Sequence, residues 1–321
     1  MQYVSLGTTG LGVSRLSIGT AAFGLDHYGI PAPREGVVDS SEAIQAIRSA
    51  AESGINLFDT APGYGHSEEL LGQALVGRKD CLIATKVPIP DDIAVISSFA
   101  LAAKVNSSVE SSLRLLQREV LDIVQIHNAT IPVLQQGELI ACLERAREAG
   151  KLRYIGASVY GEETALAAVR TGKVQVLQVA LNLLDQRMRP RLLDEAQSAG
   201  VGVLSRSALL KGALTSRSRW LPKSLRALSQ ACERVLKVLG TDWEALPAMA
   251  LRFCLSLNGV HSVLVGVRSP TEVKNCIAAE AAGPLEPDLL NQAYTLALDD
   301  DLLLNPTYWD LKEMDTRYAQ L

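Results

Sequence analysis

Four helical stretches of this chain end in a small residue followed by glycine, and an apolar run begins within about three residues of each glycine. The four glycines are Gly54, Gly150, Gly172 and Gly200. Glycine is the usual residue in the left-handed conformation just past a helix C-terminus, so each site marks the end of a helix and the approach of a strand. Strands that alternate with helices of about 10–15 residues indicate βαβ units, and therefore a parallel sheet.

This alternation predicts eight strands, which favours a (β/α)8 TIM barrel that spans residues 1–321 as a single domain. The strands are expected at 16–20, 55–59, 82–86, 121–127, 153–158, 174–181, 202–206 and 262–266. Helices are expected near 40–53, 67–77, 101–117, 135–149, 161–171, 190–199, 242–256 and 270–280, with extra helices near 223–239 and, toward the C-terminus, 286–298. Residues 3–14 predict a β-hairpin that plugs the barrel floor, and Thr241–Glu244 predicts a capping box that opens the helix at 242–256.

Ionisable side chains lie at the C-terminal ends of three successive predicted strands. Asp59, Lys86 and His127 each end or follow such a strand, and Tyr64 comes five residues after Asp59. In a barrel of parallel strands these ends converge on one rim, which is where active sites form. We therefore expect the four side chains to meet in one site.

The chemistry of the four groups suits protonation of an oxygen that becomes an alkoxide as hydride reaches its carbon. A phenol such as Tyr64 is a weak acid unless a nearby cation stabilises its anion, and Lys86 is that cation if Asp59 keeps it charged. His127 can orient a carbonyl oxygen. Taken singly, Asp59, Tyr64 and His127 each have an ordinary structural interpretation, whereas a buried lysine usually has a partner. No side chain here can supply hydride, so a nicotinamide cofactor is implied.

The sequence around these residues resembles the aldo-keto reductase family. The matching stretches are Leu16–Thr20, Asn56–Ala61 with Tyr64 and Gly65, Ala84–Lys86, Asp122–His127, Tyr154–Ser158, Gln178 with Asn182, and Leu264–Gly266. They run from the first predicted strand to the eighth, so the resemblance covers nearly the whole chain. It implies an NAD(P)H-dependent oxidoreductase that interconverts an aldehyde or ketone and the corresponding alcohol, with Tyr64 as general acid supported by Asp59, Lys86 and His127.

The resemblance also implies a row of cofactor contacts. Those at the nicotinamide end are Gly19, Thr20, Asp59, Ser158 and Gln178. Those along the pyrophosphate are Ser207, Leu209, Lys211 and Arg217. Those at the adenosine end are Gly266, Arg268, Glu272, Asn275 and Cys276.

Two positions near the nicotinamide depart from the usual family pattern. Val159 stands where the family commonly has asparagine, so one amide contact is lost. Arg206 stands where the family tends to place an aromatic platform under the nicotinamide ring. A planar guanidinium can stack on a ring, but its charge would also alter the balance between oxidised and reduced nicotinamide.

The choice between NADPH and NADH stays open, with NADPH favoured by the habit of the family. Glu272 would repel a 2′-phosphate, whereas Arg268 and Lys274 would attract one.

Charge, apolar content and cysteine usage limit the partners, metal sites and cellular compartments that are expected for this protein. A net charge of −4 with no basic run argues against a nucleic-acid partner. No apolar run approaches about 18 residues, so no membrane span is expected. Five scattered cysteines suggest neither a disulfide framework nor a zinc site, and no metal is expected. With no basic-then-apolar N-terminal segment, the cytoplasm is the expected compartment.

Two other functions stay possible on the sequence. One is a regulatory or sensor protein of the same fold that binds the cofactor but turns over poorly, and the other is a barrel lyase or isomerase that binds no nucleotide. The substrate pocket is expected to draw on the loop 22–33, with Phe23, Asp26 and Tyr28, and on a C-terminal tail with Tyr308 and Trp309. The sequence fixes neither the substrate, the direction of reaction nor the oligomeric state.

Overall fold

Eight parallel strands close into a barrel in the computed structural model, which describes residues 1–26, 28–31 and 36–311. The order around the barrel is β10-β3-β4-β5-β6-β7-β8-β9. These strands are β3 Leu16–Gly19, β4 Leu57–Asp59, β5 Leu82–Pro88, β6 Leu121–Ala129, β7 Leu152–Val159, β8 Val176–Ala180, β9 Gly202–Arg206 and β10 Ser262–Gly266. The (β/α)8 barrel predicted from the sequence is confirmed.

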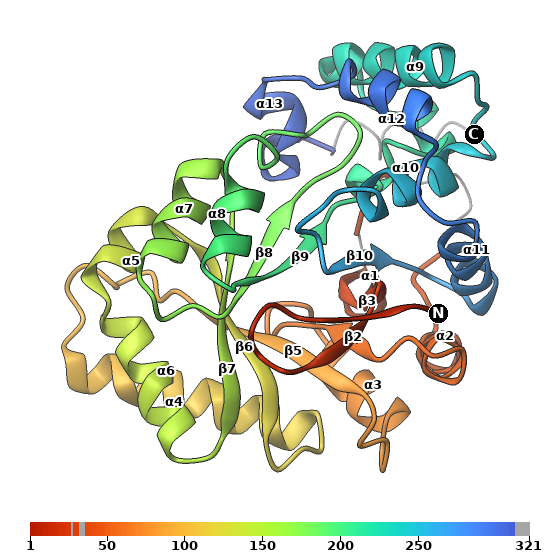
Figure 1. The fold of residues 1–321 in the computed structure, drawn as a ribbon. Coiled ribbons are helices and arrows are strands. Elements are labelled where there is room, and N and C mark those ends of the chain that lie inside the picture. The colour runs from red at the N-terminus through yellow and green to blue at the C-terminus, as the bar shows by residue number, and fades with distance from the viewer. Residues whose placement is uncertain (27, 32–35, 312–321) are drawn as a thin grey trace.

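Helices form a layer outside the strands (Figure 1). The helices that follow the barrel strands in turn include α2 Ser40–Glu52, α3 Ser67–Ala74, α4 Ser98–Leu115, α6 Glu138–Glu148, α7 Glu162–Arg170, α8 Leu192–Ser198, α10 Leu246–Leu255 and α11 Pro270–Ala281. Further helices are α1 Ala21–Gly24, α5 Ile131–Gln136, α9 Arg226–Leu239, α12 Pro287–Tyr294 and α13 Asp301–Leu304, with 3-10 turns at Leu210–Gly212, Ser216–Trp220, Lys223–Leu225 and Pro306–Tyr308. The extra helices expected near 223–239 and 286–298 are therefore present.

The helix after α9 begins later than its sequence signal indicates. The side-chain oxygen of Asp242, rather than that of Thr241, accepts hydrogen bonds from the backbone N–H of Glu244 (2.9 Å) and of Ala245 (2.8 Å). This makes a turn ahead of the helix, and α10 itself starts at Leu246 with proline in its first turn. The capping-box prediction at Thr241 is thus wrong, because the neighbouring aspartate satisfies the free N–H groups instead.

The predicted N-terminal hairpin is present and closes the floor of the barrel. Its strands, β1 Tyr3–Ser5 and β2 Gly12–Ser14, pair antiparallel. Leu6 and Leu11 are buried against inward-facing apolar side chains from the surrounding strands, such as Val176. A Cβ atom on Gly202 would lie 2.6 Å from the Leu6 side chain, so the glycine leaves room for this plug.

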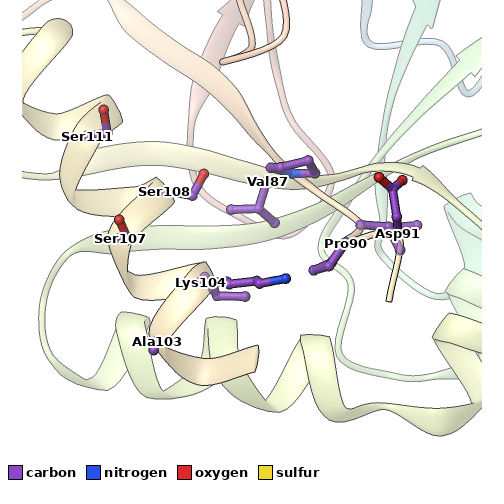
Figure 2. Close-up of a pocket in the computed structure, with 11 residues that line it drawn as sticks. Val87, Pro90, Asp91, Ala103, Lys104, Ser107, Ser108 and Ser111 are labelled. Atoms are coloured by element: carbon purple, nitrogen blue, oxygen red, sulfur yellow. The ribbon is translucent and has the colours of Figure 1, made fainter. Parts of the chain in front are cut away.

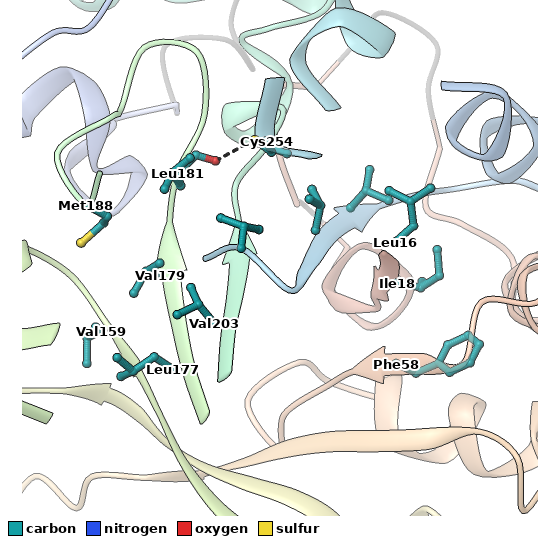
Figure 3. Packing of buried hydrophobic residues seen from close by; sticks show 14 of the residues in the cluster. Leu16, Ile18, Phe58, Val159, Leu177, Val179, Leu181, Met188, Val203 and Cys254 are labelled. Carbon is teal, nitrogen blue, oxygen red and sulfur yellow. Dashed lines mark hydrogen bonds between the residues drawn. The ribbon is translucent and has the colours of Figure 1, made fainter. Parts of the chain in front are cut away.

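Alternation along each strand separates two layers of side chains. Along β8, Val176 packs toward the barrel axis, Leu177 and Val179 pack outward against the helices, and Gln178 faces inward again. Figure 3 shows this outer apolar layer, in which the thiol of Cys254 donates to the Leu181 carbonyl at 3.3 Å. Inside the barrel, the apolar floor gives way to polar residues toward the C-terminal ends of the strands. The candidate site therefore lies inside the barrel, near the C-terminal ends of the strands.

Candidate active site

A buried ion pair lies inside the barrel above its apolar floor. Nζ of Lys86 is 2.6 Å from Oδ2 of Asp59 and donates a second hydrogen bond, of 2.9 Å, to the carbonyl of Thr60. The Lys86 side chain is 0% exposed and that of Asp59 is 6% exposed. Alternation along β5 explains the inward lysine: Ile83 and Val87 pack outward, so Lys86 must face the axis. Two desolvated charges persist in a protein when each has close partners.

Two glutamines complete the surroundings of the Asp59 carboxylate. Gln125 donates from Nε2 to Oδ1 at 3.0 Å, and Gln178 donates to the same oxygen at 2.7 Å. We call this group of four residues the polar layer: Asp59, Lys86, Gln125 and Gln178. The sequence singled out three of them but missed Gln125, although an uncharged polar residue within the apolar run 121–126 was a usable signal.

Tyr64 is held over the polar layer by the loop between β4 and α3. Its backbone N–H donates to the carbonyl of Ala61 at 3.0 Å, and its own carbonyl accepts from Ser67 at 3.1 Å. The ring stands edge-on to the His127 ring, with centroids 5.7 Å apart and an interplanar angle of 87°. Nζ of Lys86 lies 4.9 Å from the Tyr64 ring centroid. The four residues predicted to meet do lie together.

The protonation states of this group follow from burial and from the ion pair. Burial raises the pKa of Tyr64, and Asp59 raises it further, while Arg206 works in the opposite direction. Burial lowers the pKa of His127 to about 4, with the Lys86 charge adding to the effect. Burial also lowers the pKa of Lys86, and Asp59 opposes that change. At neutral pH the phenol is therefore protonated and the imidazole is neutral.

Thr20 supports the site from behind. It is fully buried, its hydroxyl donates to the Asp59 carbonyl at 2.9 Å, and it contacts the hydroxyl of Ser67. Ser67 in turn lies 2.8 Å from the hydroxyl of Thr60. Thr20 is not among the residues that line the cavity described next, so the structure places this expected cofactor contact one layer behind the surface.

A cavity of about 670 Å³ opens over Tyr64 and His127 and runs from there to the start of α11. The expected cofactor residues that line it are Gly19, Asp59, Ser158, Gln178, Arg206, Ser207, Leu209, Lys211, Gly266, Arg268, Glu272 and Asn275, together with Arg217 and Cys276. Segments far apart in the sequence thus share one continuous surface. It has the polar layer at one end and the start of α11 at the other.

The two residues expected at a nicotinamide carboxamide are joined to each other. The hydroxyl of Ser158 donates to Oε1 of Gln178 at 3.4 Å, and Gln178 uses its amide group on Asp59. This chain of bonds links the cavity wall directly to the ion pair. A ligand group that binds at Ser158 and Gln178 is therefore connected to the Asp59–Lys86 pair through these hydrogen bonds.

Cationic side chains follow the cavity toward its far end. Lys211 lies 5.4 Å from the Tyr28 ring centroid, and Nη1 of Arg217 donates to the carbonyl of Ile30 at 3.1 Å. At the start of α11, Glu272 accepts from the backbone N–H of Arg268 at 2.8 Å. The cavity thus carries positive charge along its length, with one carboxylate at the far end.

The expected pocket walls are only partly present. Tyr28 lines the cavity, but Phe23 is buried at 5% exposure in the outer core, and Asp26 is not among the lining residues. Among the tail residues that the structure describes, Pro306 lines the cavity, whereas Trp309 is buried, with its indole N–H on a backbone carbonyl, and Tyr308 is exposed. Pro33 lies outside the described residues. Tyr160 and Asn128 line the cavity without having been predicted.

A second cavity, of about 760 Å³, lies outside the barrel between the end of β5 and α4 (Figure 2). It is lined by Lys104, by serines of α4 and by the segment 87–91. Lys104 is paired there with Asp92 at 2.9 Å. No buried ionisable group lines this cavity among the residues that the structure describes, so the cavity over the polar layer is the better candidate for chemistry despite its slightly smaller volume.

Across residues 1–26, 28–31 and 36–311, no cluster of three or more His, Cys, Asp or Glu side chains is arranged to hold a metal ion. Within the same residues, no helix has both the length and the apolar character needed to cross a membrane.

TIM-barrel enzymes carry their active sites at the C-terminal ends of the strands, which is where this protein has a buried ion pair beneath Tyr64 and His127. Comparison with known proteins shows that the protein is an oxidoreductase. Residues 15–294 match the model of the Aldo/keto reductase family, and the chain belongs to that family. The resemblance stated from the sequence is therefore confirmed. Aldo-keto reductases act on carbonyl groups and use nicotinamide cofactors.

Individual relatives show how far the likeness extends. The chain is 33% identical over 297 residues to L-galactose dehydrogenase of Arabidopsis thaliana, with 86% of each chain covered. It is 30% identical over 310 residues to the NADH-specific methylglyoxal reductase of Escherichia coli, covering 87% of this chain and 93% of the relative. The holo form of aldo-keto reductase AKR11C1 from Bacillus halodurans has 28% identity and a TM-score of 0.78, covering 93% and 97% of the two chains.

Proposed function

We propose that this protein reduces a small polar aldehyde or ketone, or oxidises the matching alcohol, with Tyr64 as the general acid. The observation that carries the proposal is the position of Tyr64 in the cavity wall, next to His127 and over the Lys86–Asp59 pair. A bound nicotinamide would supply the hydride. The side chains would bind the carbonyl and move its proton.

The proton donor is poised by its surroundings. Because the pKa of Tyr64 is raised by burial, the phenol keeps its proton until negative charge develops on the substrate oxygen. The neutral imidazole of His127 can then donate one hydrogen bond to that oxygen and fix its direction. The ammonium of Lys86 lies under the Tyr64 ring, where it stabilises the phenolate that the transfer leaves behind. Asp59 and Gln125 would hold Lys86 in place rather than contact the substrate.

The cavity fits a nicotinamide dinucleotide. Ser158 and Gln178 offer hydrogen-bonding groups for a carboxamide near Tyr64, and Lys211 and Arg217 lie farther along, where a pyrophosphate would need positive charge. We favour NADPH over NADH, because Arg268 adds a further cation at the adenosine end and the family commonly uses NADPH. Glu272 acts against that preference, and one relative is named as NADH-specific.

The substrate class follows from the cavity wall near Tyr64. Tyr28, Asn128 and Tyr160 bring two phenols and an amide to this region. Such groups hydrogen-bond to hydroxyl or carbonyl oxygens beside the reacting carbon, which suits a sugar-like or other small polar carbonyl compound. The names of the relatives, an L-galactose dehydrogenase and a methylglyoxal reductase, are compatible with this class.

The test is a panel of carbonyl substrates assayed with NADPH and NADH at the nicotinamide absorbance. Steady turnover of a polar aldehyde or ketone supports the proposal. A protein that binds the reduced cofactor but fails to oxidise it even in a single turnover with every substrate would instead be a regulatory protein, a function that the relatives do not support. Absence of nucleotide binding would reject both.

A further inference from the structure

The guanidinium of Arg206 is held in one place at the mouth of the barrel. Its Nη2 donates to the carbonyl of Val159 at 3.2 Å, and its Nη1 donates to the hydroxyl of Ser207 at 3.2 Å. Its central carbon lies 4.1 Å from the ring centroid of Tyr160, which is cation–π distance. Ser207 has a φ of 60°, an uncommon left-handed conformation for a residue other than glycine. Three contacts from the ends of two strands, β7 and β9, therefore hold the Arg206 guanidinium in place.

That charge faces the reacting groups. Arg206 lines the same cavity as Tyr64 and His127. Burial has the largest effect on the pKa of both side chains, and Arg206 is among the charges that lower each of them. Because the electrostatic field of Arg206 acts on both Tyr64 and His127, it also acts on any ligand that binds between these residues and the cavity wall.

The cofactor ring must bind in that region if the proposed function holds, since hydride transfer needs the nicotinamide close to the carbonyl that Tyr64 protonates. The oxidised ring carries a positive charge and the reduced ring does not. A fixed cation therefore repels the oxidised form and leaves the reduced form almost unaffected. Lys86 is also a cation, but Asp59 is 2.6 Å from it and offsets its field.

We propose that Arg206 makes this site select reduced over oxidised nicotinamide cofactor, and that Tyr160 is the positioning residue that holds the guanidinium for this purpose. The proposal rests on the proposed function only in requiring that a nicotinamide bind in the cavity. With the guanidinium ~6 Å from the charged nicotinamide ring, an effective dielectric near 20 corresponds to about a hundredfold difference in affinity between the reduced and oxidised cofactor. Solvent would reduce this difference to about tenfold. The oxidised product would consequently leave more readily after carbonyl reduction.

Calorimetric titration with both cofactor forms tests the idea through the ratio of their dissociation constants. The wild-type protein should bind the reduced form at least about tenfold more tightly. Arg206→Gln, which removes the charge, should bring that ratio at least about fivefold closer to one. Tyr160→Leu should also lower the ratio, because the guanidinium loses its stacking partner, whereas Tyr160→Phe keeps the ring and should preserve it.

Each competing role for these residues gives a different result. If Arg206 instead binds a pyrophosphate oxygen, Arg206→Gln weakens both forms equally and the unchanged ratio overturns the proposal. A preserved ratio in Tyr160→Leu would overturn the role of Tyr160. Equal affinity of wild-type protein for both forms overturns redox selection while leaving the proposed function intact. Absence of any nucleotide binding defeats the proposed function itself. Arg206→Lys, which keeps the charge, serves as the folded control and should retain most of the ratio.

Discussion

Gln125 donates a hydrogen bond of 3.0 Å from Nε2 to Oδ1 of Asp59, a residue 66 positions earlier in the chain. The bond joins β6 to β4 across β5, which carries Lys86. It limits rotation of the carboxylate whose other oxygen holds the ammonium. Oε1 of the same amide is buried and has no partner within the part of the chain that the structure describes. Gln125 thus combines one favourable contact with one unsatisfied atom.

These two features predict different effects on stability for two substitutions of similar size. Gln125→Leu loses a bond to a charged group, about 1.5–3 kcal/mol, but also removes an unpaired buried oxygen of comparable cost, so stability should change little. Gln125→Glu places a second carboxylate against Asp59 and should be clearly destabilising at neutral pH. Urea unfolding of the two variants compares them directly. Equal loss of stability in both would show that the bond, rather than the charge balance around Asp59, decides the effect.

Lys86→Met should leave the Asp59 carboxylate buried without its cation. Removing one partner of a buried ion pair typically costs about 3–5 kcal/mol, so the midpoint of thermal unfolding should fall substantially along with activity. The double variant Lys86→Met with Asp59→Asn removes both charges and should recover much of the stability, although not the activity. Thermal unfolding of the single and double variants measures this. A double variant as unstable as the single one would show that packing, rather than the unpaired charge, causes the loss.

The pKa of His127 determines how stability changes in mild acid. Burial depresses this pKa to about 4 in the folded protein, against about 6.5 in an unfolded chain. Between these values the unfolded state binds more protons, so stability should fall as the pH drops from about 6.5 to about 4. The contribution is at most about 3 kcal/mol, and solvent near the partly exposed ring reduces it.

Removal of the titrating ring tests that assignment. His127→Asn should lose less stability than the wild-type protein when unfolding is compared at pH 7 and pH 4.5. Activity of the wild-type protein should show no inflection near pH 6.5, since the imidazole stays neutral there. Identical acid sensitivity in both proteins would assign the effect to other groups.

Periodicity made the barrel predictable. Along β5, alternating burial sends Ile83 outward and Lys86 inward, and the same period-2 pattern with intervening helices recurs around the barrel. The C-terminal rim of a parallel barrel then brings Asp59, Lys86 and His127 together from three strands. Nothing beyond strand order is needed for that step.

Side-chain partners and loop paths were less predictable. Tyr160 follows a strand as an ordinary loop aromatic, and only the three-dimensional structure shows that it stacks on Arg206, which is 46 positions later. The tail residue Trp309 packs into the core, although the sequence predicted that the C-terminal tail with Tyr308 and Trp309 would form a pocket wall. Contacts between distant loops depend on how each loop packs, and no local pattern encodes that packing.

Tyr64→Phe should separate chemistry from binding. The substitution removes the phenolic proton and keeps the ring that stands edge-on to His127. Turnover should fall by about 10²–10⁴-fold, the usual contribution of a general acid, while cofactor affinity stays near that of the wild-type protein. Single-turnover and equilibrium-binding measurements on the same preparation check both parts. Retained turnover would remove Tyr64 from the role of proton donor.

The carboxylate of Glu272 should weaken binding of the 2′-phosphate that distinguishes NADPH from NADH. It lines the far end of the cavity, where the proposed nucleotide would place its adenosine, and its Oε2 accepts from the backbone N–H of Arg268. Glu272→Gln removes the negative charge but keeps an oxygen that can accept the same hydrogen bond, so the first turn of α11 should be preserved. We expect affinity for NADPH to rise by about three- to tenfold, the gain for removing one charge repulsion near solvent, with little change for NADH. Because the effect is electrostatic, it should shrink as ionic strength increases from 0.01 to about 0.5 M. Parallel titrations of both nucleotides against both proteins at low and high salt measure it. Equal changes for NADPH and NADH would mean that Glu272 contacts a part of the nucleotide that the two share.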